Sequence, residues 1–304
     1  MRVSGPLLIF IAAVLWGLDG VLRRSLFELS PIVIVFLEHL IGLIIISPFL
    51  LRVWKSERLT KNEWSALILV SFLSGVLGTL FFTSALLAVN FISFSVVFLI
   101  QKLQPIFSVA TAAVVLKERI SKSYLLWAAL ALIAGYFVTF PNGVVNFADG
   151  SGAVTAALFA LLAAICWGSS TAFSRFVLLS HSNTFITGTR FLFTTVLSAL
   201  LVIMLSKTNT LSAVNLSHVS TLAVIAVSTG MLALWVYYRG LKKTPASVSA
   251  IVELAFPMTA VLVDYFLYGT LLSVSQYIAG VVLLFSMYKL ATLPSGVKFL
   301  EETR

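Results

Sequence analysis

Charged residues are scarce in this chain. Only 10% of its 304 residues are Asp, Glu, Lys or Arg, whereas about 25% is usual for a soluble domain. So little polar surface cannot cover a globule of this length, and a disordered chain needs still more charge. The composition therefore excludes both classes. Because hydrophobic residues make up 60% of the sequence, it indicates a polytopic membrane protein.

Cysteine and the common catalytic motifs are also scarce. The single cysteine, Cys166, leaves no intramolecular disulfide possible. The sequence contains no Walker A, His-Glu-x-x-His or Gly-x-Ser-x-Gly motif. We therefore expect no cofactor, no metal and no direct use of ATP, and a transporter in place of an enzyme. A channel-like facilitator or a lipid scramblase is the alternative, and an intramembrane enzyme is the least favoured class.

Long apolar runs fill most of the sequence. A membrane-spanning helix needs about 20 such residues, and helices satisfy their own backbone polar groups in lipid. We predict an all-α polytopic membrane protein with ten transmembrane helices. The ten runs cover about 5–26, 31–51, 64–87, 91–115, 123–140, 152–177, 183–205, 217–241, 246–268 and 272–291.

The two halves of the chain repeat. The pattern Ala-Ala-x-x-Trp-Gly occurs at Ala12–Gly17 and again at Ala163–Gly168, and Ser-Val-x8-Pro starts at Ser95 and again at Ser247. The distance along the chain between the two copies differs by only one residue between the two patterns, which indicates a duplicated five-helix unit. Because five is odd, the second copy is inverted in the membrane, an arrangement typical of transporters. We expect repeats over residues 1–147 and 148–293, followed by a short tail, 294–304.

Basic residues lie mostly on one side of the predicted membrane. Cytoplasmic loops are enriched in Lys and Arg, so the asymmetry predicts a multi-pass protein of the cytoplasmic (inner) membrane with both termini in the cytoplasm. The net charge of +9 then reflects the orientation of the chain in the membrane, and we expect no nucleic-acid partner. Fifteen of the 20 basic residues fall on that side: Arg2, Arg52, Lys55, Arg58, Lys61, Lys117, Arg119, Lys122, Arg175, Arg239, Lys242, Lys243, Lys289, Lys298 and Arg304.

These features resemble the drug/metabolite transporter superfamily, EamA type. Each half has a Trp-Gly in its first helix, and Gln104-Pro105 is followed by the turn Lys117–Ser121, which is similar to the family's Gly-Glu-x-Leu/Ile-Ser/Thr. Thr270 stands where the second half of family members often has Glu. The resemblance implies a transporter of small metabolites, with a central cavity between the first four helices of each half and the fifth helices at the periphery.

Charged side chains inside apolar runs are candidate site residues, because each costs about 2.5–3.5 kcal/mol to insert. We expect Arg190 to pair with Glu253, and Lys102 to pair with Asp19 or Glu38, since buried charges rarely stay unpaired. Asp264 lies near a helix end, where it can reach water. The candidates are Asp19, Glu38, His39, Lys102, Arg190, Glu253 and Asp264.

Two prolines point to further polar groups as candidates, because each removes a hydrogen-bond donor from its helix. Pro105 and Pro257 cannot donate to the carbonyls of Gln101 and Glu253. A freed carbonyl beside a polar side chain is a candidate ligand site, to which Gln104 adds an amide. The alternative is that both prolines are packing kinks and that these side chains bond to neighbouring helices.

Aromatic residues complete the candidates. Trp16 and Trp167 lie in the middle of helices, away from the interfacial belt. Trp16 shares a helix face with Asp19 and Arg23, a combination that suits an amine through cation–π and ionic contacts. Packing against neighbouring helices is the alternative. The other aromatic candidates are Phe81, Phe82, Tyr237 and Tyr238.

The expected substrate is a small polar or zwitterionic metabolite, such as an amino acid or related amine. We expect secondary-active export or exchange by alternating access, by a monomer or dimer in the lipid bilayer. Protons are the candidate coupling ion, through Glu38 and His39, because histidine titrates near neutral pH. The alternative for His39 is a structural hydrogen bond to a neighbouring helix.

Overall fold

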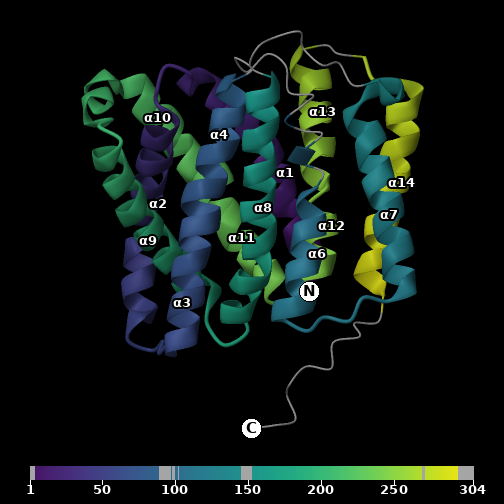
Figure 1. Cartoon of the computed structure of the whole chain (residues 1–304), viewed down its shortest axis with the longest axis horizontal. Coiled ribbons are helices and arrows are strands. Elements are labelled where there is room, and N and C mark those ends of the chain that lie inside the picture. Colours follow the sequence, from purple (N-terminus) through teal and green to yellow (C-terminus); the bar gives the residue numbers. More distant parts are fainter. Residues whose placement is uncertain are drawn as a thin grey trace.

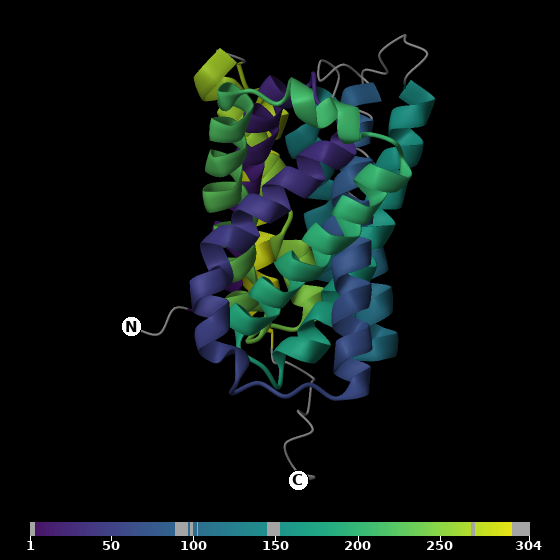
Figure 2. The ribbon, with the colours of Figure 1, turned by 90° about the vertical axis from the view of Figure 1, so that its left-hand side faces the viewer.

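The structure, a computed structural model, describes residues 4–88, 97, 100–101, 103–144, 153–268 and 271–293. These residues form one bundle of roughly parallel and antiparallel helices, with no strand among them (Figure 1; Figure 2). Eight helical segments within these ranges are long and apolar enough to cross a membrane, by length and composition. The prediction of an all-helical polytopic membrane protein is confirmed.

Within the described residues, the first half supplies four helical segments long enough to span a membrane and one shorter apolar helix. The second of the long spans is α2, and the third is continuous over residues 61–88, where a π-helical segment joins two α-helices. The elements are α1 (Gly5–Arg23), η1 (Arg24–Leu26), α2 (Pro31–Trp54), α3 (Lys61–Val70), η2 (Ser71–Gly78), α4 (Thr79–Ala88), α6 (Gln104–Val115), α7 (Lys122–Thr139) and η3 (Pro141–Gly143). Of these, α6 is a shorter apolar helix, and α7 also has the length of a span.

The second half follows the same order. Its third span also contains a π-helical segment, η5, between two α-helices. The elements are α8 (Ala153–Leu178), α9 (Asn183–Met204), η4 (Thr208–Ala213), α10 (Leu216–Ile225), η5 (Ala226–Gly230), α11 (Met231–Leu241), α12 (Ala246–Val252), α13 (Ala255–Tyr268) and α14 (Val274–Thr292).

Helix packing reflects the sequence repeat. The π-helical segments end at Gly78 and Gly230, which are related by the same shift as Pro105 and Pro257. In space, α1 packs on α11 and α13, just as α8 packs on α4 and α6. The α2–α9 pair lies at one side of the bundle and the α7–α14 pair at the other (Figure 1). The exact boundaries proposed for the repeats stay a prediction.

One predicted helix is broken. The run over residues 246–268 divides into α12 and α13 on either side of Glu253 and Leu254. Pro257 has no N–H for the Glu253 carbonyl, but the N–H of Phe256 donates to that oxygen at 2.9 Å. The prediction that the Glu253 carbonyl is free was therefore wrong, because a tighter turn replaces the lost hydrogen bond.

The glycines of the Trp-Gly pairs allow close helix packing. A Cβ added at Gly17 would lie 2.5 Å from the Thr259 Cβ of α13, and one at Gly168 would lie 2.6 Å from the Gln104 carbonyl oxygen of α6. A backbone oxygen cannot rotate away as a side chain can. Glycine at position 168 therefore holds α8 and α6 together beside the centre of the bundle.

We expect Gly168→Ala to lower the free energy of unfolding by about 1–3 kcal/mol, because overpacking forces the two backbones apart. Gly280→Ala is the matched control, since an added Cβ there meets no atom within 4 Å. That control should be neutral or stabilising by up to about 1 kcal/mol, because alanine favours helices. Unfolding in detergent measures both values, and equal losses would contradict the packing argument.

Candidate functional site

A central cavity of about 200 Å³ lies between the two halves and receives side chains from both. Lys102 and the side chain of Asp264 lie outside the described residues. Whether the lining residues bind a substrate stays a prediction. The predicted residues that line the cavity are Trp16, Asp19, Glu38, His39, Phe82, Gln101, Gln104, Trp167, Arg190, Tyr237, Tyr238 and Glu253.

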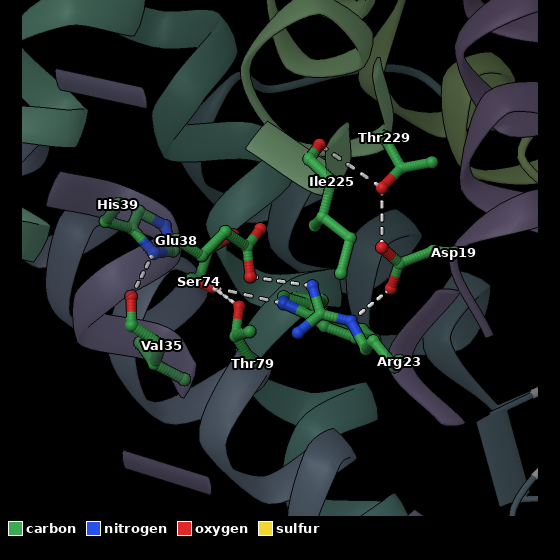
Figure 3. A network of polar contacts seen from close by, with 10 residues as sticks. Asp19, Arg23, Val35, Glu38, His39, Ser74, Thr79, Ile225 and Thr229 are labelled. Carbon is green, nitrogen blue, oxygen red and sulfur yellow. Dashed lines mark hydrogen bonds and ion pairs between the residues drawn. The ribbon is translucent and has the colours of Figure 1, made fainter. Parts of the chain in front are cut away.

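One wall of the cavity holds a cluster of Asp19, Arg23, Glu38 and Thr229, called here the Arg23 cluster (Figure 3). Arg23 Nε binds Asp19 Oδ2 one turn away, and its Nη2 binds Glu38 Oε2 of α2 at 2.7 Å. Thr229 of η5 donates to Asp19 Oδ1 at 2.6 Å. Both acids predicted to meet Lys102 or an amine therefore bind Arg23, because that side chain turns inward and is only 5% exposed.

Arg190 occupies another wall of the cavity. Its Nη1 donates to the Tyr238 hydroxyl at 2.7 Å and its Nη2 to Ser74 Oγ at 2.6 Å. Its buried Nε has no hydrogen-bond acceptor among the described residues. The predicted ion pair with Glu253 is not formed, because neutral hydroxyls take these donors. The guanidinium thus faces the cavity with spare hydrogen-bonding capacity.

Glu253 lies at the break between α12 and α13. Its Oε1 accepts from the Tyr237 hydroxyl at 2.6 Å, and its Oε2 accepts from Gln104 Nε2 at 3.0 Å. Gln101 instead donates to the Ala160 carbonyl of α8 at 3.0 Å. Gln104 and Glu253, which come from equivalent regions of the two halves, therefore meet directly, whereas Gln101 makes the packing contact given above as the alternative.

Two aromatic pairs flank the cavity. Trp16 of α1 lies 5.1 Å from Tyr237 of α11, and Phe82 of α4 lies 5.1 Å from Trp167 of α8, measured between ring centroids. Each pair joins the two halves. The indole N–H of Trp167 also donates to a backbone oxygen of η2 at 3.1 Å. The ring of Phe81, by contrast, stacks on a ring of α8, with 6.0 Å between the two centroids.

The hydrogen bond of His39 lies within its own helix, whereas the alternative to proton coupling predicted a bond to a neighbouring helix. Its Nδ1 lies 2.8 Å from the Val35 carbonyl, one turn away (Figure 3). Its ring centroid lies 4.9 Å from that of Phe191. Because a carbonyl only accepts, Nδ1 carries the proton of this hydrogen bond. Nε2 is the nitrogen left to take part in any other contact.

A buried ion pair lies at the lower end of the bundle in Figure 1, where the loop between α8 and α9 lies. Arg175 of α8 binds Glu118 at 3.3 Å and the Thr244 carbonyl at 2.7 Å. Glu118 also accepts from the N–H groups of Ala246 and Ser247, at 2.7 and 3.1 Å. Glu118 therefore ties α8 to the N-terminus of α12.

A second contact at this end joins the loops that follow α2 and α8. His181 Nδ1 lies 2.7 Å from Glu57 Oε2, and its Nε2 lies 3.2 Å from Glu63. Lys242 donates to the His181 carbonyl at 2.7 Å. Burial alone would raise the pKa of Glu57, but hydrogen bonds from His181 and Ser182 outweigh it and hold that pKa below its ordinary value.

This lowered pKa gives a pH dependence. A depressed carboxyl pKa contributes stability above the ordinary pKa of about 4.5, and that contribution is lost as the pH falls through the lowered value. We expect Glu57→Gln to lower the melting temperature at pH 7, and the gap to the unmodified protein to shrink below about pH 4. Exposed Glu28 offers the control Glu28→Gln, which should show no gap. A difference in melting temperature that grows as the pH falls would contradict the lowered pKa of Glu57.

The cavity contains polar residues that the sequence did not reveal. Arg23 was expected to share a helix face with Trp16 and Asp19 but was not predicted as the partner of Asp19, although its spacing of four from Asp19 was a usable signal. Single hydroxyls in apolar helices usually bond to their own backbone, so nothing distinguished those that face the cavity. They are Ser74, Thr79, Ser170, Thr171, Ser174 and Thr229.

Comparison with known proteins places these features in context. The EamA-like transporter family matches residues 3–140 and again 154–292. A protein of Fusobacterium nucleatum subsp. nucleatum, named riboflavin transporter ImpX, is 35% identical over 295 residues, which cover 96% of this chain and 99% of that protein. A solved crystal structure has a TM-score of 0.73 at 20% identity, covering 97% of this chain and 99% of its own. This last likeness shows the fold alone.

Proposed function

Because this chain belongs to the EamA-like transporter family, we propose that it carries riboflavin or a closely related flavin across the membrane as a secondary-active transporter. The observation that carries the proposal is the near full-length similarity to a protein named as a riboflavin transporter. The cavity chemistry supports it independently, since a flavin combines a flat aromatic ring with a chain of hydroxyls.

The ring has suitable partners in the cavity. The Trp16–Tyr237 and Phe82–Trp167 pairs supply aromatic surfaces from both halves, and offset stacking between such surfaces is favourable. Arg190 Nε is a buried donor without an acceptor among the described residues, which suits a ring carbonyl. Glu253 and Gln104 add an acceptor and an amide.

An amino acid or related amine, as expected from the sequence, is the second candidate. The observation in its favour is Glu253, whose hydrogen bonds come from the neutral groups of Tyr237 and Gln104. An ammonium group could pair with this carboxylate. The cluster around Asp19 favours this candidate less, because Arg23 already neutralises part of its charge.

For either substrate, the proposed cycle is alternating access, in which the two halves exchange conformations around the central cavity. The bias of basic residues supports placing the described chain ends, Ser4 and Leu293, on the cytoplasmic side of an inner membrane. Export or exchange, proton coupling and the choice of monomer or dimer stay predictions.

Transport in proteoliposomes tests the proposal. We expect saturable riboflavin uptake that is accelerated when unlabelled riboflavin is loaded inside, because counterflow is a property of a carrier and not of a channel. Liposomes without protein are the control, and a panel of amino acids is assayed in parallel. Saturable amino-acid uptake without riboflavin uptake would reject the flavin proposal in favour of the second candidate.

A further inference from the structure

We propose that the Arg23 cluster is the subsite for the hydroxylated side chain of the substrate, with the ring held by the aromatic pairs. This inference rests on the proposed flavin function and adds an orientation to it. Its starting point is hydrogen-bonding capacity that the cluster leaves unused inside the cavity.

The unused donor belongs to Arg23. Its Nε and Nη2 bind Asp19 and Glu38, but its Nη1 is buried and has no acceptor within the described part of the chain. Leaving such a group buried and unpaired is unfavourable. A ligand atom that accepts from Nη1 would remove this cost.

The unused acceptor belongs to Glu38. Arg23 binds its Oε2, whereas Oε1 accepts no hydrogen bond from the residues that the structure describes. Gly230 lies beside this oxygen, and even a Cβ there would approach it to 3.1 Å. The absence of a side chain at Gly230 keeps the space next to Oε1 open.

A hydroxyl matches this pair of groups better than other ligands do. A hydroxyl has both an acceptor that suits Arg23 Nη1 and a donor that suits Glu38 Oε1. The cluster carries two carboxylates and one guanidinium, so its formal charge is negative and disfavours a phosphate. An ammonium would suit Glu38 but would leave Nη1 unpaired, because it offers only donors.

The geometry of α1 joins this cluster to the aromatic wall. Trp16, Asp19 and Arg23 share one helix face and line the same cavity. Along the helix axis, the two cluster residues lie about 4.5 and 10.5 Å beyond Trp16. A flat ring against Trp16 can therefore extend a polyol chain toward Asp19 and Arg23.

Binding of riboflavin, lumiflavin and riboflavin phosphate to the purified full-length protein in lipid nanodiscs tests the inference. Riboflavin carries the polyol chain, whereas lumiflavin has the same ring with a methyl group in its place. We expect riboflavin to bind about tenfold more tightly or better, the equivalent of one well-made polar contact. Riboflavin phosphate should bind more weakly than riboflavin.

Two variants assign this difference to the cluster. Arg23→Leu should weaken riboflavin binding about tenfold and lumiflavin binding less than about twofold. Glu38→Gln preserves side-chain volume and should weaken riboflavin alone by about threefold to tenfold, so it decides the question if Arg23→Leu does not fold. Glu57→Gln, at the lower end of the bundle, is the control and should leave both affinities unchanged.

The outcomes separate the two proposals. If the unmodified protein binds neither flavin, the proposed function fails. If it binds riboflavin and lumiflavin equally, or binds the phosphate most tightly, the function stands and the polyol subsite is overturned. The subsite is also overturned if a folded Glu38→Gln variant weakens both flavins to the same extent.

Discussion

Replacing Glu118 with alanine is expected to lower the free energy of unfolding by about 3–5 kcal/mol, the cost of removing one partner of a buried ion pair. Glu118 is 5% exposed and accepts from Arg175 and from two backbone N–H groups at the start of α12. Alanine removes all of these acceptors at once. Unfolding by a denaturing detergent, monitored by helical circular dichroism, measures the loss.

Two further variants show whether charge or hydrogen bonding is responsible. Glu118→Gln keeps an acceptor for the backbone N–H groups and should lose less stability than Glu118→Ala. Glu28→Ala removes a carboxylate whose side chain is 65% exposed and should change stability by less than about 0.5 kcal/mol. An effect of Glu118→Ala as small as that of Glu28→Ala would show that the lower end is not held by this pair.

Replacing Trp16 with alanine is expected to weaken riboflavin binding by about 5- to 100-fold. The estimate takes about 1–3 kcal/mol for the loss of one aromatic ring stacked on a heterocyclic base, converted at 1.4 kcal/mol per tenfold. Trp16→Phe retains an aromatic face and should lose less than about fivefold. Quenching of flavin fluorescence in nanodiscs measures the dissociation constants.

The control for this prediction is Trp127→Ala. Trp127 of α7 packs edge-on against Phe285 of α14, 5.6 Å away, at the side of the bundle. Its removal should affect stability but leave riboflavin affinity unchanged. If Trp16→Ala and Trp127→Ala weaken binding equally, the effect is one of general stability and the aromatic wall does not hold the ring.

The fold was largely predictable because lipid imposes a simple constraint on sequence. Runs such as 31–51 can satisfy their backbone polar groups only as helices, and α2 covers that run. The break in 246–268 was harder to predict. Pro257 signals a disturbed helix, but whether the chain kinks or divides depends on which N–H replaces the lost donor, here that of Phe256.

The candidate site was predictable where charge marks it. Asp19, Glu38 and Arg190 stand out because they are costly in lipid, and all three line the cavity. Their partners were not predictable, since pairing depends on how helices rotate against each other. The ion pair of Arg23 with Glu38 joins α1 to α2, and the hydrogen bond of Ser74 with Arg190 joins η2 to α9.

The buried contact of Glu118 has a consequence for the proposed transport cycle. Position 270, related to Glu118 by the internal repeat, is a threonine, and one uncharged hydroxyl cannot bind a guanidinium and two backbone amides as a carboxylate does. In the proposed alternating-access cycle, an opening of the lower end that separates α8 from α12 breaks the contact of Glu118. Each 1.4 kcal/mol that this contact contributes then lowers the population of that opened form about tenfold.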